Sequence, residues 1–214
     1  MSLIIKICGL KTPETLEAAI AAGADWVGFV FFAKSPRNVS LDEAKAFGQI
    51  VGSRAKKVAL SVDADDAALA DIEKALKPDF HQLHGHETSA RVAAIRAKFG
   101  RPVIKAIGIA EAGDLEAARA YETAADWLLL DAKPPKNAAL PGGNGLTFDW
   151  QLLAGLDLEK PFMVSGGLDP SNVGEAIAIS HPAGVDVSSG VETAPGVKDP
   201  AKIRAFIEAA RRAN

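Results

Sequence analysis

Two side chains in this sequence are candidates to exchange protons with a ligand, and they lie far apart in the chain. Cys8, the only cysteine, directly follows the apolar run "LIIKI". Asp131 ends the run "DWLLLD", so three leucines lead into its carboxyl group. Apolar surroundings disfavour a charged carboxylate, which suits Asp131 to donate a proton near neutral pH. A thiolate at Cys8, flanked by Lys6 and Lys11, could act as a base or a nucleophile.

Both side chains also have an ordinary structural interpretation. A free cysteine is most often a buried small hydrophobe. An aspartate in the position of Asp131 can cap the next loop or pair with Lys133. The residues alone leave these alternatives open, because the choice depends on whether the fold brings Cys8 and Asp131 together.

Arg37 and a histidine-rich segment supply further candidates. Arg37 lies in "FAKSPRNVS", where its planar guanidinium can grip a carboxylate with two hydrogen bonds or remain a solvated surface group. Side chains alternate along a strand, so His81 and His84 in "HQLHGHE" point to opposite faces, which disfavours zinc. We expect His84 to line a pocket, His81 to lie in the core and no metal to bind, and we assign no role to His86.

Two turns near the C-terminus are candidates for binding a phosphate. They read "SGGLDPSN" and "DVSSGVE", and their glycines and small residues expose backbone N–H groups that favour an anion. One such turn alone is more simply a tight turn, but two at paired positions of a barrel favour a phosphate site. The candidates for substrate binding in these turns are Gly166, Gly167, Asp186, Ser188, Ser189 and Gly190.

The elements that must position these residues alternate regularly. Short apolar runs recur between alanine-rich stretches with helical spacing, in eight pairs. The runs are nearly continuous, which is typical of strands buried on both faces of a parallel sheet. An open doubly wound sheet is the alternative, but eight such units in 214 residues favour an α/β fold with a single (β/α)8 barrel domain over residues 1–214. In that fold the strand ends, and the candidates that follow them, meet at one mouth.

Proline residues that follow a potential capping residue predict the starts of three helices. Proline suits the first position of a helix, and this predicts helix starts at Thr12–Pro13, Asp169–Pro170 and Asp199–Pro200. A further helix is expected over "FDWQLL" after the sixth strand. The segment Ala132–Thr147 is a long loop rich in Pro, Gly and Asn, and we expect it to close over a ligand.

Composition narrows the classes of partner. A net charge of −3 gives no reason to expect nucleic acid or an anionic membrane as a partner. No run approaches the roughly 20 apolar residues of a membrane span, and the first apolar stretch is too short for a signal peptide. A single cysteine cannot form an internal disulfide. We therefore expect a cytoplasmic location.

The motifs together resemble the phosphoribosylanthranilate isomerase family of tryptophan biosynthesis. The resemblance covers nearly the whole chain and keeps the family's order in "KICGL", "GFVFFAKSPRNVS", "QLHG", "LLLDAK" with "PGGNGLTFDW", "SGGLDPSNV" and "GVDVSSGVETAPGVKDPAKI". It implies a (β/α)8 barrel. It also implies an Amadori rearrangement of N-(5-phosphoribosyl)anthranilate to 1-(2-carboxyphenylamino)-1-deoxyribulose 5-phosphate without a cofactor.

Roles follow from the resemblance, residue by residue. Cys8 matches the family's general base and Asp131 its general acid, while Arg37 would hold the anthranilate carboxylate and the two glycine-rich turns the phosphate. The expected partner is this phosphosugar–anthranilate substrate, and the chain is expected to be a monomer or homodimer. Two departures leave the acid and the base untouched: His86 stands where an acid is common, and Ser165 stands where alanine is frequent.

Three competing interpretations remain. The sister barrel of histidine biosynthesis performs the same rearrangement on a larger, bisphosphorylated substrate, but that family has an aspartate where Cys8 stands and an internal half-barrel repeat. A non-catalytic phosphosugar-binding barrel predicts tight binding without turnover. A purely structural role for the glycine-rich turns predicts no phosphate binding at all.

Overall fold

The protein folds as a closed parallel barrel. The computed structural model describes residues 3–134, 142–143, 145 and 147–213. Eight strands pair in chain order, and β1 closes the ring against β8. They are β1 Ile4–Cys8, β2 Trp26–Phe31, β3 Lys56–Ser61, β4 Phe80–Leu83, β5 Val103–Ile109, β6 Trp127–Ala132, β7 Phe162–Val164 and β8 Gly184–Val187. The (β/α)8 prediction is confirmed.

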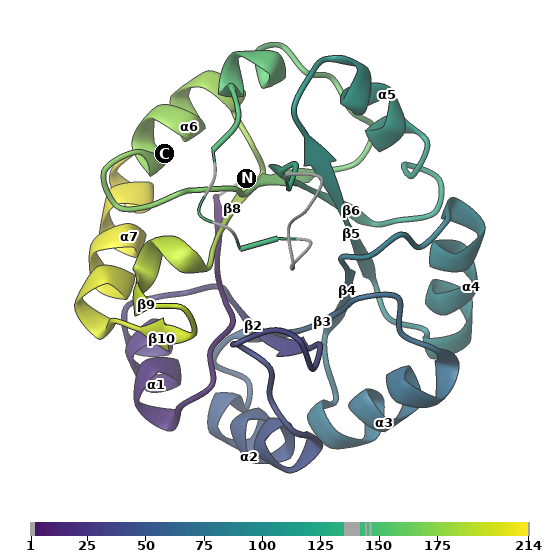
Figure 1. The fold of residues 1–214 in the computed structure, drawn as a ribbon. Coiled ribbons are helices and arrows are strands. Elements are labelled where there is room, and N and C mark those ends of the chain that lie inside the picture. The colour runs from purple at the N-terminus through teal and green to yellow at the C-terminus, as the bar shows by residue number, and fades with distance from the viewer. Residues whose placement is uncertain (1–2, 135–141, 144, 146, 214) are drawn as a thin grey trace.

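A ring of helices surrounds the strands, as Figure 1 shows in a view along the barrel axis. Within the described part of the chain these are α1 Pro13–Ala21, α2 Leu41–Val51, α3 Asp66–Leu76, α4 Ser89–Phe99, α5 Gly113–Arg119, α6 Val173–Ser180 and α7 Pro200–Arg212. The predicted starts of α1 and α7 are confirmed, because Thr12 and Asp199 cap them and proline follows each cap. No helix of the described residues is both long and apolar enough to span a membrane.

The helix start predicted at Asp169–Pro170 is wrong, because a turn occupies these residues. The Asp169 carboxylate accepts a hydrogen bond from the N–H of Ser171 at 2.7 Å. Its backbone carbonyl accepts from Asn172 and Val173. The bond from Val173 has helical spacing, but Asn172 has a φ of −118°, so the regular helix α6 begins only at Val173.

The helix predicted over "FDWQLL" is also wrong, since the segment forms only the single 3-10 turn η1, Trp150–Leu153. Asp149 caps it, but Ala154 already has an extended ψ of 117° and Gly155 a positive φ of 72°. The chain therefore leaves the helical conformation after one turn. A short antiparallel hairpin that the sequence analysis did not predict, β9 Glu192–Ala194 with β10 Val197–Lys198, follows β8.

The side chains inside the barrel change from apolar to charged and polar toward its mouth. An apolar cluster inside the barrel contains Trp26, Val58, Ile104, Ala106, Leu129 and Met163. Lys6 lies beside Trp26 and Asp186 in the strand register, so all three side chains point to the same side of the wall. Lys6 is fully buried, and so is Gln82 of β4. Charged and polar groups therefore lie inside the barrel, beneath its mouth.

Candidate active site

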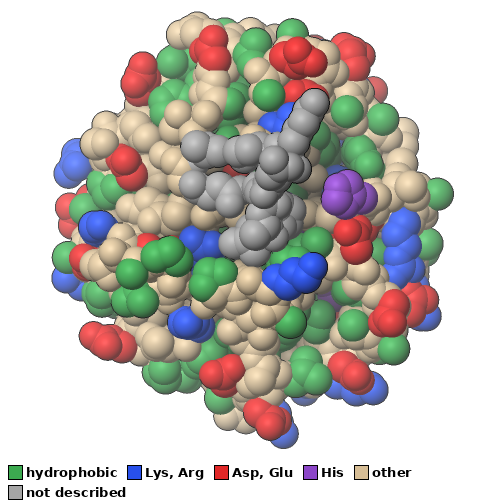
Figure 2. All heavy atoms as spheres, viewed as in Figure 1, with side chains coloured by type: hydrophobic (Ala, Val, Ile, Leu, Met, Phe, Trp, Pro, Cys, Tyr) green, Lys and Arg blue, Asp and Glu red, His purple; other side chains and the backbone are tan. Residues whose placement is uncertain are grey.

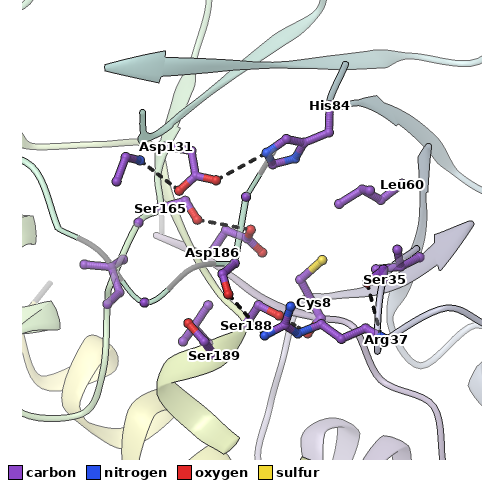
Figure 3. A pocket seen from close by; sticks show the side chains of 18 of the residues that line it. Cys8, Ser35, Arg37, Leu60, His84, Asp131, Ser165, Asp186, Ser188 and Ser189 are labelled. Carbon is purple, nitrogen blue, oxygen red and sulfur yellow. Dashed lines mark hydrogen bonds and ion pairs between the residues drawn. The ribbon is translucent and has the colours of Figure 1, made fainter. Parts of the chain in front are cut away.

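A cavity that is partly open to solvent lies at the carboxyl ends of the strands. Its lining includes nearly all the predicted site residues, namely Cys8, Arg37, His84, Asp131, Gly166, Gly167, Asp186, Ser188 and Ser189. Figure 3 shows side chains from several strands directed toward this space. Gly190 does not line it. The backbone of Gly190 instead packs against the carbonyl of Leu168, which holds the turns after β7 and β8 together.

Charges of both signs surround the mouth. In Figure 2, which views this same face, Lys and Arg side chains and Asp and Glu side chains are both scattered over the described surface.

Asp131 lies in a fixed hydrogen-bonding position at the end of β6. It is 6% exposed, and its Oδ1 accepts a hydrogen bond from the N–H of Ala132 at 2.9 Å. Its Oδ2 lies 3.2 Å from Nε2 of His84 (Figure 3). The alternative pairing with Lys133 is wrong, because Lys133 binds Asp114 instead at 2.6 Å.

Gln82 is the partner on the other side of the His84 ring. Its Nε2 lies 3.1 Å from Nδ1 of His84. When the amide donates to Nδ1, the remaining ring nitrogen carries the hydrogen and donates it to Asp131. Gln82 and His84 are two residues apart and so share a strand face, a signal in "HQLH" that the sequence analysis did not use.

Cys8 lies at the end of β1 with its sulfur directed into the cavity (Figure 3). It is 3% exposed. Burial raises the pKa of the Cys8 thiol, and the positive charges of Lys6 and Lys198 oppose this shift. Neither lysine was among the predicted site residues. Lys6 was noted in the sequence only as a charge flanking Cys8, although it precedes Cys8 by two residues on the same strand and so shares its face.

Arg37 is not a solvated surface arginine, so that alternative is wrong. It is 5% exposed and lines the cavity. Its guanidinium donates two hydrogen bonds to Glu192, from Nε at 2.8 Å and from Nη2 at 2.9 Å. Nη2 also donates to the carbonyl of Gly143 at 3.3 Å. Glu192 orients Arg37, and the sequence analysis missed it because the two residues are 155 positions apart.

Lys198 connects this ion pair to the strand ends. Its Nζ donates to Glu192 and to the carbonyl of Ser188, both at 2.8 Å. The Ser188 hydroxyl donates to the carbonyl of Cys8 at 3.2 Å. Burial lowers the pKa of Lys198 to about 8, although Glu192 acts in the opposite direction. A continuous set of contacts therefore runs from Arg37 to β1.

The two glycine-rich turns lie together at the mouth. Gly166 and Gly167 have positive φ angles of 84° and 62°, a backbone conformation that favours glycine. A Cβ at Gly166 would lie 2.8 Å from that of Ala132, so no side chain fits there. Ser189 begins the 3-10 turn η2, Ser189–Val191, whose first N–H groups have no acceptor within the turn. Phosphate binding at these turns stays a prediction.

Part of the segment Ala132–Thr147 also reaches the site. A Cβ at Gly142 would lie 2.6 Å from Nε2 of His84 and 2.7 Å from Oδ2 of Asp131. Residues 135–141, 144 and 146 lie outside the described residues. The expected closure over a ligand therefore stays a prediction.

His81 lies in the core, as expected. His81 is fully buried, and its Nε2 lies 2.8 Å from Glu73, so it is a core residue. His86 is exposed beside Asp63. Among the described residues, no group of three or more His, Cys, Asp or Glu side chains is arranged to hold a metal ion.

Comparison with known proteins places the whole chain in one family. The family model for N-(5'phosphoribosyl)anthranilate (PRA) isomerase matches residues 5–209. The chain belongs to the PRA isomerase family. It is 61% identical over 211 residues to the N-(5'-phosphoribosyl)anthranilate isomerase of Rhodopseudomonas palustris strain HaA2, covering 99% of this chain and 97% of the relative. The resemblance inferred from the motifs is thereby confirmed.

Solved structures agree with the family assignment. The PRA isomerase from Thermotoga maritima superimposes with a TM-score of 0.89 at 35% identity, covering 99% of this chain and all of that one. A PRA isomerase solved in complex with reduced 1-(o-carboxyphenylamino)-1-deoxyribulose 5-phosphate gives a TM-score of 0.86 at 33% identity, with the same coverage.

Proposed function

We propose that this member of the PRA isomerase family rearranges N-(5'-phosphoribosyl)anthranilate to 1-(o-carboxyphenylamino)-1-deoxyribulose 5-phosphate, with Asp131 as general acid and Cys8 as general base. The observation that carries the residue assignment is the common cavity: β6 and β1 deliver an acid and a thiol to the same space at the barrel mouth. An aldose–ketose rearrangement needs one group of each kind on a single sugar.

In the first step Asp131, in its protonated form, gives its proton to the furanose ring oxygen. The bond between that oxygen and C1 breaks, and the lone pair of the anthranilate nitrogen forms a C1=N double bond. The Asp131 carboxylate that remains has fixed donors, since Ala132 donates to it and His84 lies 3.2 Å away. These contacts stabilise the charge left by the departing proton.

In the second step the Cys8 thiolate removes the proton from C2. The electrons of that C–H bond form a C1=C2 double bond, and those of the C=N bond return to nitrogen, which gives an enolamine. Tautomerisation then adds a proton at C1 and removes one from the C2 hydroxyl. Atoms and electrons balance within the substrate and the two side chains, so these steps need no cofactor.

Two groups of the substrate have candidate partners in the cavity lining. The compound bound in the related structure carries a carboxyphenyl group and a phosphate. Arg37, oriented by Glu192, offers a guanidinium for the carboxylate. The turns containing Gly167 and Ser189 offer backbone N–H groups for the phosphate.

The test measures turnover of PRA by the loss of its anthranilate-type fluorescence, in the wild type and in Cys8→Ala and Asp131→Asn. We expect each substitution to lower kcat by about 10³-fold, within the range of general acid–base catalysis. Turnover within tenfold of the wild type in both variants would overturn the assignment. A folded wild type that binds PRA without converting it would favour the non-catalytic barrel.

A substrate panel separates the two enzyme alternatives. The same assay is run with the larger bisphosphorylated substrate of the histidine pathway: turnover of PRA supports the proposal, and turnover of the bisphosphorylated substrate alone supports the sister barrel. The proposed setting is the cytoplasm, with the small phosphosugar as ligand and the chain as a monomer or homodimer.

A further inference from the structure

Burial of the Cys8 thiol works against its assigned role as a base. A thiol removes a proton from carbon only as the thiolate, yet burial raises the pKa of Cys8. A buried anion is stable only when a fixed positive charge compensates it. The site must therefore hold a cation near the sulfur.

Lys6 is placed to supply that positive charge. It precedes Cys8 by two residues on β1, so both side chains point into the barrel. Their close approach is visible at Gly28 on the neighbouring strand. A Cβ there would lie 2.9 Å from Sγ of Cys8 and 3.2 Å from Nζ of Lys6. The missing side chain of Gly28 leaves a space that both the sulfur and the ammonium border.

Asp186 fixes the Lys6 ammonium. Their atoms Nζ and Oδ1 lie 2.7 Å apart, and the two side chains are 0% and 5% exposed. The pKa of Lys6 is raised above its ordinary value: burial alone would lower it, but Asp186 and Cys8 outweigh that cost. Lys6 is not among the residues that line the cavity, so it reaches the reaction only through Cys8.

We propose that Lys6, anchored by Asp186, is a positioning residue whose ammonium stabilises the thiolate form of Cys8 that takes the C2 proton. The proposal rests on the function assigned to Cys8 above. It adds the group that makes a buried thiol competent as a base. During the step the proton moves to sulfur while the Lys6 ammonium keeps its own protons, so Lys6 exchanges nothing with the substrate.

The test reads the thiolate directly, without substrate. Cys8 is the only cysteine, so the alkylation rate of the native protein by iodoacetamide reports this one sulfur. In Lys6→Met we expect alkylation at pH 8 to be about tenfold slower than in the wild type. A fall of less than threefold would overturn the proposal. In the turnover assay kcat should fall while KM stays within twofold, because Lys6 does not touch the substrate.

A second variant keeps the test decisive if Lys6→Met does not fold with Asp186 left unpaired. Lys6→Met/Asp186→Asn removes both charges, and replacing a whole buried pair is tolerated better than breaking one. Lys6 affects the Cys8 thiol more strongly than Asp186 does. We therefore expect this double variant to alkylate about threefold more slowly than the wild type, and a rate equal to or above the wild type would overturn the proposal.

The matched control is Lys105→Met. Lys105 is another buried lysine in an ion pair, with Glu87 at 2.8 Å, and it does not line the cavity. Its substitution should leave the alkylation of folded protein within twofold, and an equal slowing in Lys105→Met would show that any lost pair perturbs Cys8. Alkylation also separates this proposal from the proposed function: retained turnover in Cys8→Ala would refute the catalytic role and leave the alkylation result unchanged.

Discussion

Two buried ion pairs of the same chemistry lie on opposite faces of the barrel wall. Lys6–Asp186 and Lys105–Glu87 have N–O distances of 2.7 and 2.8 Å, and none of the four side chains is more than 5% exposed. Lys6 shares the inner face with Cys8. Lys105 lies beside Leu83 and Leu128 in the strand register, and both leucines belong to the outer core beneath the helices.

What differs is the third group that each lysine contacts. Lys105 also donates to the carbonyls of Leu83 and Gly85, and Glu87 accepts from the N–H groups of Asp63 and Gly85. This pair fixes the loops after β3 and β4. Lys6 instead faces a thiol at the edge of a cavity. A buried ion pair stabilises the fold where its other contacts are backbone groups, as at Lys105. Where its neighbour is a thiol, as at Lys6, the same kind of pair can stabilise a reactive anion.

The largest effect expected from this comparison is on stability. Lys105→Met leaves Glu87 charged and buried, and breaking a buried pair costs about 3–5 kcal/mol. Urea denaturation should show this loss, while kcat per folded molecule stays within twofold. The double variant Lys105→Met/Glu87→Gln should recover part of the stability. A large loss of kcat without a loss of stability would reverse the assigned roles of the two pairs.

A second prediction concerns the ion pair that orients the substrate-binding arginine. Glu192→Gln weakens the two-hydrogen-bond grip on Arg37, so KM should rise about tenfold while kcat changes less than threefold. The matched control is Glu17→Gln, because Glu17 also binds an arginine, Arg54, through two hydrogen bonds, but on the exposed surface. An unchanged KM in Glu192→Gln would show that Arg37 does not need this partner.

A third prediction concerns the pH dependence of Cys8 alkylation in the wild type and in the Lys6 and Lys105 variants. The thiolate fraction of Cys8 grows tenfold per pH unit below its pKa, and burial raises that pKa above the ordinary value of 9.0. Alkylation of the wild type should therefore keep rising up to pH 9 without a plateau. Lys105→Met should follow the same profile, and Lys6→Met should lie below it throughout. A plateau below pH 8 in the wild type would contradict the raised pKa of Cys8, and coinciding profiles of Lys6→Met and the wild type would contradict the role of Lys6.

The smallest effect is expected at the point where Lys6 and Cys8 meet. Gly28→Ala places a methyl group 2.9 Å from the Cys8 sulfur, so the sulfur or the ammonium must shift. We expect alkylation and kcat each to fall about threefold, since a small displacement weakens a charge interaction without removing it. Gly113→Ala, where a Cβ would meet no atom within 4 Å, is the control. Equal rates of alkylation and turnover in Gly28→Ala and the wild type would show that the Lys6 ammonium and the Cys8 sulfur do not interact beside Gly28.

Much of this arrangement could be predicted from local sequence. The strand ends at Cys8 and Asp131 follow from apolar runs and from the rule that barrel sites lie at the carboxyl ends of strands. The proline starts of α1 and α7 were correct because each has a side-chain cap directly before it. Asp169 makes the same side-chain bond as Asp199, to the N–H group two residues on. The helix start failed at Asp169 because Asn172 has a φ of −118° and the regular helix begins only after it.

Long-range partners could not be predicted from local patterns. Nothing near Arg37 in the sequence indicates Glu192, which reaches it only through an unpredicted hairpin after β8. Lys6 and Asp186 are 180 positions apart and become neighbours only because the barrel closes between β1 and β8. The alternation of side chains along a strand predicts which side of the barrel wall a residue faces. Closure of the barrel determines which distant residues become neighbours on that side.

The most direct test of Cys8 as the general base is turnover of freshly generated PRA by the wild type and by Cys8→Ser, measured side by side as loss of fluorescence. Serine keeps the shape of the side chain but its hydroxyl does not ionise near neutral pH, so the account predicts fast turnover by the wild type and a loss of about 10³-fold in the variant. Equal turnover by a folded Cys8→Ser variant would contradict the account and make Cys8 a core residue.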